Sequence, residues 1–167
     1  MRGYNNLGRK HLIQGTAALQ TLGVGIVGHG FMGKVHAYGY RILRIYYEHA
    51  PLPTRLVGVA DAAPERAPLA VEQAGLEFSA TDWRELGERD DIHIIGICSP
   101  NSLHTNQLLA AVEAGKHVYC DKPLVAGEES TARVEAALGQ SGHETENGRA
   151  RLDANGCILS TAGWPTS

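Results

Sequence analysis

A glycine-rich turn is the part of this 167-residue chain whose residue types and spacing best suit ligand binding. Residues 23–33 read GVGIVGHGFMG, so an apolar run leads into G-x-G-x-x-G and then into a helical pattern. In such a turn Gly28 permits the tight bend, Gly30 lets the backbone approach a pyrophosphate, and Gly33 lets the helix pack closely on the strand. Free amides and the positive end of the helix would hold the phosphates. The alternative is a glycine-rich turn that binds no ligand.

An acidic residue after the second apolar run fits the same kind of ligand. Asp61 follows Val59 and Ala60, where a carboxylate can accept hydrogen bonds from the adenosine ribose of a dinucleotide. Its charge would repel a 2′-phosphate, so the sequence predicts NAD, with NADP disfavoured. Arg66 is the one residue that could reverse this preference. The alternative role for Asp61 is a helix cap before Pro64.

Two more polar clusters follow apolar runs, at the position where open α/β sheets bind their ligands. Residues 99–104 read SPNSLH, and residues 121–123 read DKP. A lysine beside an acid, as Lys122 is, can do acid/base work near a nicotinamide ring, whose positive charge would tune the proton affinity of the lysine. The alternative is an ordinary solvated loop lysine.

The elements that must position these residues alternate between short apolar runs and helical patterns, which is typical of βαβ units. We expect strands at residues 24–27, 56–60, 77–79, 92–98 and 117–120. We expect helices after the glycine turn, between residues 64 and 75, and at residues 103–114 and 128–138. The pattern predicts an α/β fold, a Rossmann-type doubly wound parallel sheet of order 3-2-1-4-5.

The first helix carries apolar residues and one histidine at steps of three and four, which we expect to form one buried stripe: Phe31, Val35, Tyr38, Ile42, Ile45 and His49. Around the sheet, composition divides the chain into an extension at residues 1–21, a dinucleotide-binding domain at 22–138 and a tail at 139–167. We expect this tail to be unpatterned, with an edge strand at residues 157–160 as the alternative.

The composition excludes several other classes of protein. Hydrophobic residues at 43% and charged residues at 20% are near globular averages, which excludes disorder and collagen. Three cysteines without a CxxC pair predict no disulfide framework, no metal site and a cytoplasmic location. No run approaches the length of a membrane span, so no membrane partner is expected. Six cationic residues precede Glu48, but they have no aromatic platform between them, so no nucleic-acid partner is expected.

The ordered set of motifs resembles the Gfo/Idh/MocA family, that of glucose-fructose oxidoreductase and inositol dehydrogenase. The resemblance runs from residue 22 to about residue 138. It is carried by VGIVGHGFMG at 24–33 with His36, VAD at 59–61, PER at 64–66, SPN at 99–101 with His104, EAGKHV at 113–118 and DKPL at 121–124. Members of the family are NAD(P)-dependent oxidoreductases, mostly of sugars and polyols, with a Rossmann domain followed by a substrate domain.

The resemblance implies a role for each motif residue. Pyrophosphate contacts would come from Gly28, Gly30, Phe31, Met32 and Gly33, and Asp61 would contact the adenosine ribose. The path toward the nicotinamide would be lined by Ser99, Pro100, Asn101 and His104. Lys122 corresponds to the lysine of the family's E-K-P motif, a proton relay or orienting group near the reacting carbon. Asp121, in place of the usual glutamate, and Pro123 would complete the cofactor site.

The family's substrate domain cannot fit in residues 139–167, so we expect it to be missing and the chain to be truncated, or frameshifted near Gly139, relative to its full-length parent. The parent would transfer hydride between nicotinamide and a sugar, polyol or related hydroxy compound. This chain would bind the cofactor without efficient turnover. The alternative is a non-catalytic nucleotide-binding or interaction module, and self-association through the exposed interdomain face stays open.

Overall fold

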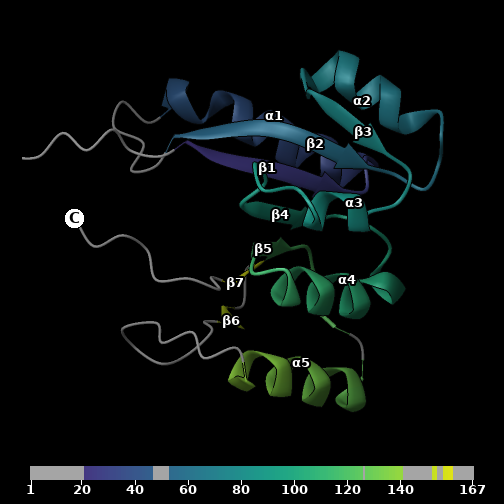
Figure 1. The fold of residues 1–167 in the computed structure, drawn as a ribbon, viewed down its shortest axis with the longest axis vertical. Helices are drawn as coiled ribbons and strands as arrows, with labels where there is room; N and C mark the ends of the chain where they lie inside the picture. The colour runs from purple at the N-terminus through teal and green to yellow at the C-terminus, as the bar shows by residue number, and fades with distance from the viewer. Residues whose placement is uncertain (1–20, 47–52, 126, 141–151, 154–155, 160–167) are drawn as a thin grey trace, which may run out of the picture.

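A computed structural model describes residues 21–46, 53–125, 127–140, 152–153 and 156–159 of the chain. In these ranges a central sheet lies between two layers of helices (Figure 1). Its strands, in the order in which they pair, are β3 (Phe78–Ala80), β2 (Thr54–Ala60), β1 (Leu22–Val27), β4 (Ile94–Ile97), β5 (His117–Cys120), β7 (Gly156–Leu159) and β6 (Leu152–Asp153). The first five are parallel, which confirms the predicted 3-2-1-4-5 order.

Helices cover both faces of the sheet. One face carries α1 (Phe31–Tyr46) and α2 (Arg66–Ala74), and the other carries α3 (Arg84–Gly87), α4 (Asn101–Glu113) and α5 (Glu128–Gln140). The short α3 was not predicted, because four residues are fewer than the window in which helical periodicity can be recognised. Within the described ranges, no helix combines the length and the hydropathy that crossing a bilayer requires.

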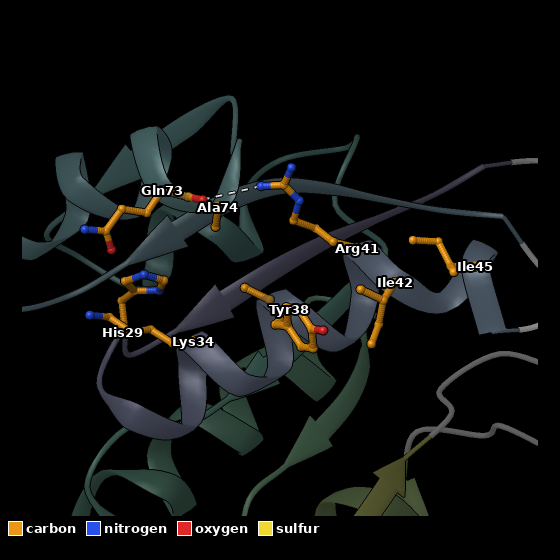
Figure 2. A pocket seen from close by; sticks show the side chains of 9 residues that line it. His29, Lys34, Tyr38, Arg41, Ile42, Ile45, Gln73 and Ala74 are labelled. Atoms are coloured by element: carbon orange, nitrogen blue, oxygen red, sulfur yellow. Dashed lines mark hydrogen bonds between the residues drawn. The ribbon is translucent and has the colours of Figure 1, made fainter.

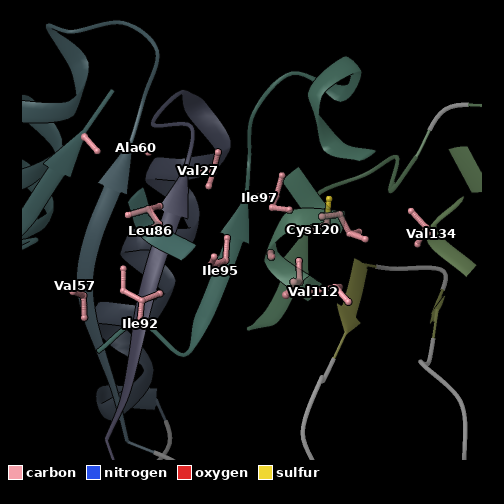
Figure 3. Packing of buried hydrophobic residues seen from close by; sticks show 14 residues of the cluster. Val27, Val57, Ala60, Leu86, Ile92, Ile95, Ile97, Val112, Cys120 and Val134 are labelled. Atoms are coloured by element: carbon pink, nitrogen blue, oxygen red, sulfur yellow. The ribbon is translucent and has the colours of Figure 1, made fainter. Parts of the chain in front are cut away.

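The strands bury side chains on both faces, so their apolar runs need no polar alternation. Val24 and Ile26 of β1 pack in the cluster under α1 and α2, whereas Val27 packs in the cluster under α3, α4 and α5. Figure 3 shows the second cluster, which extends from Val57 and Ala60 of β2 to Val134 of α5, with Leu86 of α3 between them. The helices are thereby held against the sheet, and the residues at the strand ends have fixed positions.

The buried stripe predicted for α1 is wrong. Phe31 is 81% exposed, Tyr38 is 63% exposed and Ile45 is 78% exposed. The helix turns Gly33 and Ala37 toward the sheet instead, because it passes so close to β1 that a Cβ at Gly33 would lie 2.0 Å from the carbonyl oxygen of Gly28. Gly33 and Ala37 are therefore the fully buried residues of this helix face, Tyr40 packs partly buried beside them, and Phe31, Tyr38 and Ile45 are exposed. His49, the last residue of the predicted stripe, lies outside the described residues.

The expectation of an unpatterned tail is wrong at residues 152–153 and 156–159. There β7 pairs antiparallel with β5, joining Val118 to Leu159 and Cys120 to Cys157, and β6 pairs antiparallel with β7. The edge of β5 offers unpaired backbone groups that a further strand can satisfy. The alternative, a strand at residues 157–160, agrees with β7 at residues 157–159, although β6 and not β7 lies at the edge of the sheet and Ser160 lies outside the described residues. The predicted extension, apart from Thr21, lies outside the described residues, and the domain boundaries stay a prediction.

Candidate functional site

The register of the sheet brings four strand ends to the same edge. Val27 of β1 pairs with Ala60 of β2 and with Ile97 of β4, and Ile97 pairs with Cys120 of β5. The residues that follow these ends are Gly28, Asp61, Cys98 and Asp121. They continue the ladder, since the N–H groups of Gly28, Cys98 and Asp121 donate to the carbonyl oxygens of Ala60, Val27 and Ile97 at 2.7, 2.8 and 2.9 Å, respectively. The glycine turn and both polar clusters therefore meet here.

The glycine turn has the shape that its sequence predicts. Gly28 has φ of +87°, a conformation that side chains disfavour, and a Cβ there would lie 2.8 Å from the carbonyl oxygen of Cys98. Nothing lies within 4 Å of a Cβ built on Gly30, so the space beside this backbone is open in the described structure. An open backbone next to a helix N-terminus is the arrangement that accepts phosphate oxygens.

Asp61 is held by the loops on either side of it. Its side chain is buried, at 8% exposure for the residue, and it accepts hydrogen bonds from the N–H of His29 at 2.7 Å and of Ala63 at 2.9 Å. Helix α2 starts only at Arg66, so Asp61 caps the turn before that helix and not the helix itself. Each carboxylate oxygen has a second lone pair, which leaves acceptor capacity for ribose hydroxyls.

A pocket of about 670 Å³ opens at this edge, within the usual range for ligand sites. The predicted site residues that line it are Gly28, Gly30, Phe31, Met32, Asp61, Ser99, Pro100 and Asp121. It is also lined by residues that sequence reasoning did not assign to the site, among them Thr81, Trp83, Leu103 and Gln107. Thr81 and Trp83 follow β3, and Gln107 lies one turn after Leu103 on α4, so the strand-end rule and helical spacing could have found them. Arg66 lies on the same pocket as Asp61.

The other predicted residues lie near the pocket but do not line it: Gly33, Asn101, His104, Lys122 and Pro123. His104 is fully buried, with its ring nitrogens 2.9 Å from the carbonyl oxygens of Pro123 and Ser99. These contacts join the loop after β4 to the loop after β5. Lys122 is exposed, and its backbone N–H donates to Asp121 Oδ1 at 2.8 Å. The structure therefore places His104 as a support for the site and Lys122 at its rim.

A titratable cluster lies between α1 and the ends of β4 and β5. His36 Nδ1 is 3.3 Å from Cys98 Sγ, and the His36 ring lies 4.8 Å from the ring of Tyr119, measured between centroids. Burial lowers the pKa of His36, and the Asp121 carboxylate opposes that change. Burial raises the pKa of Cys98 to about 12, with a further contribution from Asp121. His36 and Cys98 are therefore neutral near pH 7, and the neighbouring charge at this end of the pocket comes from Asp121.

Solved structures share this architecture. The levoglucosan dehydrogenase complex with NADH and levoglucosan matches with a TM-score of 0.69 and 39% identity, over 72% of this chain and 33% of that one. The scyllo-inositol dehydrogenase of Lactobacillus casei, solved with NAD(H) and scyllo-inositol, matches with a TM-score of 0.63 and 28% identity, over 72% of this chain and 34% of that one.

Curated sequences agree with the structures. A levoglucosan dehydrogenase of Pseudarthrobacter phenanthrenivorans is 46% identical over 120 residues, which cover 71% of this chain and 30% of that protein. The chain thus spans about a third of the length of its relatives. Residues 22–144 match the model of the oxidoreductase family Gfo/Idh/MocA, described by its NAD-binding Rossmann fold. The chain therefore belongs to the Gfo/Idh/MocA family of oxidoreductases and carries its NAD-binding Rossmann domain.

Proposed function

We propose that this chain serves as the cofactor-binding part of an NAD-dependent dehydrogenase of a sugar, polyol or related hydroxy compound. The observation that carries the proposal is the buried Asp61 carboxylate beside the open turn at Gly28 and Gly30, all on one pocket. The levoglucosan and scyllo-inositol dehydrogenases, solved with NADH or NAD(H) and their ligands, support the substrate class.

In this proposal each group of pocket residues binds a different part of the dinucleotide. The backbone at Gly28 and Gly30, with Phe31 and Met32, holds the pyrophosphate at the start of α1. Asp61 accepts hydrogen bonds from the adenosine ribose, and Ser99, Pro100 and Asp121 lie toward the nicotinamide end. Ser99 Oγ donates to Gln107 Oε1 at 2.5 Å, which holds the serine side chain against α4.

Lys122 is the proposed acid/base or orienting group. NAD, when bound, accepts a hydride from a carbinol carbon or returns it, and the protein supplies orientation and proton handling. Lys122 Nζ would hold or receive the hydroxyl proton. The hydrogen bond from the Lys122 N–H to Asp121 Oδ1 orders the backbone that carries this amine. Because Lys122 lies at the exposed rim and not on the pocket wall, we expect NAD binding by this chain without efficient turnover.

A titration of the purified chain with NADH tests the proposal, with nicotinamide fluorescence as the readout. We expect saturable binding that weakens about tenfold or more in Asp61→Ala, since a charged acceptor is lost. Asp90→Ala is the matched control, because Asp90 is exposed and lies off the pocket, and it should bind as the wild type does. Absence of NADH binding by the folded wild-type chain would overturn the proposal.

The predicted lack of turnover needs a separate assay. With NAD and a panel that includes levoglucosan, myo-inositol and scyllo-inositol, we expect no NADH formation above a protein-free blank. If the wild-type chain turned over a substrate and Lys122→Ala did not, the prediction of inefficient turnover would be refuted. The proposed role in cofactor binding would remain. Binding of NADH without turnover leaves the non-catalytic nucleotide-binding module as the second candidate, favoured by the rim position of Lys122. The cytoplasmic location, the absence of nucleic-acid and membrane partners, and self-association stay predictions.

A further inference from the structure

A second pocket lies between α1 and α2, with His29 of the glycine turn at one end of it. It has a volume of about 480 Å³ and shares no lining residue with the cofactor pocket. Figure 2 shows His29 and Lys34 at one end of this groove and Ile42 and Ile45 toward the other, with Tyr38 between them. The distance from Lys34 to Ile45 along the helix is about 16 Å. The groove thus has a polar end and an apolar end.

The described lining of the groove carries cations and no carboxylate. Lys34 and Arg41 come from α1, and Gln73 from α2 supplies an amide. Arg41 Nη1 donates to the carbonyl oxygen of Gln73 at 3.4 Å, which joins the two helices across the groove. Asp61 does not line the groove, although its charge acts on His29, and the charged residues of the lining itself are the cations Lys34 and Arg41. The electrostatics of the groove therefore favour an anion.

A buried imidazole lies at the polar end of the groove. His29 is only 3% exposed, and its Nδ1 has no hydrogen-bond partner among the residues that the structure describes. Leaving a buried polar atom without a hydrogen bond is unfavourable, so such atoms are rare unless a ligand or water meets them. The pKa of His29 is lowered by burial and by Lys34, with Asp61 opposing, so the ring is neutral near pH 7. A neutral imidazole can carry its proton on Nδ1 and donate it to an anion.

We propose that the groove between α1 and α2 binds a small amphipathic monoanion, a carboxylate with an unbranched apolar body. The carboxylate lies between His29 Nδ1 and the Lys34 ammonium. The apolar body lies along Tyr38, Ile42 and Ile45. The groove shares no lining residue with the cofactor pocket, but a smaller pocket lined by His29, Lys34 and Gln73 as well as Gly30, Phe31 and Arg66 adjoins both. The His29 backbone N–H holds Asp61 on the cofactor side, whereas the His29 side chain lines the groove, so we expect both ligands to bind together, and competition with NADH tests this.

Isothermal titration of decanoate into the chain saturated with NADH tests this site. We expect one decanoate per chain, with affinity about tenfold lower in Lys34→Gln because a charged hydrogen bond is lost. Ile45→Ser should also weaken decanoate, since it removes apolar area at the far end. Arg133→Gln, an exposed change on α5, is the matched control and should leave affinity unchanged. Decyltrimethylammonium, with a cationic head on the same body, should not bind.

His29→Leu can also be tested by its melting temperature, which is measured without any ligand. It removes the unpartnered Nδ1 but keeps the backbone N–H, so we expect decanoate binding to be lost while the melting temperature without ligand holds or rises. Three results would overturn the proposal: no decanoate binding to the wild-type chain, displacement of decanoate by NADH, or equal binding of decyltrimethylammonium. Failure of NADH to bind at all would overturn the cofactor role instead, and decanoate titration without NADH would still test the groove.

Discussion

The backbone N–H of His29 donates a 2.7 Å hydrogen bond to the Asp61 carboxylate. This bond joins the turn after β1 to the turn after β2, two segments 32 residues apart in the chain. It fixes the carboxylate beside the glycine turn without using up its capacity to accept further hydrogen bonds. The glycine turn and Asp61 therefore hold each other in position without a ligand.

The choice between the two nicotinamide dinucleotides should depend on Asp61 and Arg66, which lie on one pocket. A 2′-phosphate beside the carboxylate is repelled, so we expect NADH to bind about tenfold or more tightly than NADPH. Asp61→Ser should lower the preference for NADH over NADPH, because it removes the charge that repels the 2′-phosphate. Adding Arg66→Gln to that variant should raise the preference again, because it removes a cation that attracts the 2′-phosphate. Parallel fluorescence titrations with both cofactors measure the ratio. A wild-type preference for NADPH would show that Arg66 outweighs Asp61.

Trp83 lines the cofactor pocket, with the Arg84 guanidinium 4.5 Å from the centre of one of its rings. NADH bound in this pocket should quench the fluorescence of Trp83, because the nicotinamide dinucleotide absorbs where tryptophan emits. We expect Trp83→Phe to remove much of the quenching. Quenching that is unchanged in Trp83→Phe would contradict NADH binding beside Trp83.

Gly33 and Gly39 lie on the same helix, and we expect their replacement by alanine to change the free energy of unfolding in opposite directions. A Cβ at Gly33 would lie 2.0 Å from a backbone oxygen, whereas a Cβ at Gly39 meets nothing within 4 Å in the described structure. Gly33→Ala should lower the free energy of unfolding by about 1–3 kcal/mol through overpacking. Gly39→Ala should raise it by about 0.5–1 kcal/mol, since alanine favours a helix. Urea denaturation of the two variants measures both signs, and equal effects would contradict the close approach of α1 to β1.

His104 should determine the order of the loops that it joins. Replacing it with alanine removes two contacts to carbonyl oxygens and a fully buried ring, so we expect a loss of unfolding free energy of about 3 kcal/mol. Amide hydrogen exchange should quicken in the segments that contain Ser99 and Lys122. Asn106→Ala, an exposed change on the same helix, is the control. Unchanged exchange at both segments would exclude the supporting role.

The stability of the fold should fall in mild acid. The pKa of His36 is below its ordinary 6.5 in the folded chain, because the ring is partly buried. As the pH falls below 6.5, the unfolded chain binds a proton that folded His36 does not, so stability is lost until the lower folded pKa is reached. Cys98, Tyr119 and Asp121 face this ring, and only Asp121 favours its protonation.

Urea midpoints between about pH 7.5 and about pH 5.5 measure this loss. His36→Asn removes the titrating ring, so the drop in midpoint should be smaller than in the wild type. His117→Asn, a change at another histidine outside this cluster, serves as the comparison. An unaltered drop in His36→Asn would mean that another group causes the acid sensitivity.

The sequence by itself determined the sheet and the location of the site. Runs such as residues 24–27 and 56–60 are rich in β-branched residues, and their chain order with the intervening helices allows the 3-2-1-4-5 sheet that the structure confirms. The turn at Gly28 and the acid at Asp61 were found because each is a local requirement, one of backbone conformation and one of charge at a strand end. The family follows from the same motifs.

Only the tertiary structure decided which surfaces these elements share. The spacing of the apolar residues of α1 predicted one buried stripe, whereas the structure buries the small residues Gly33 and Ala37 against the sheet instead. The pairing of β7 with the edge of β5 joins segments that lie far apart in the chain. The His29 Nδ1, which has no hydrogen-bond partner among the described residues, belongs to a side chain at the end of the groove between α1 and α2. Pairing and burial between distant segments depend on the whole fold, so no local pattern records them.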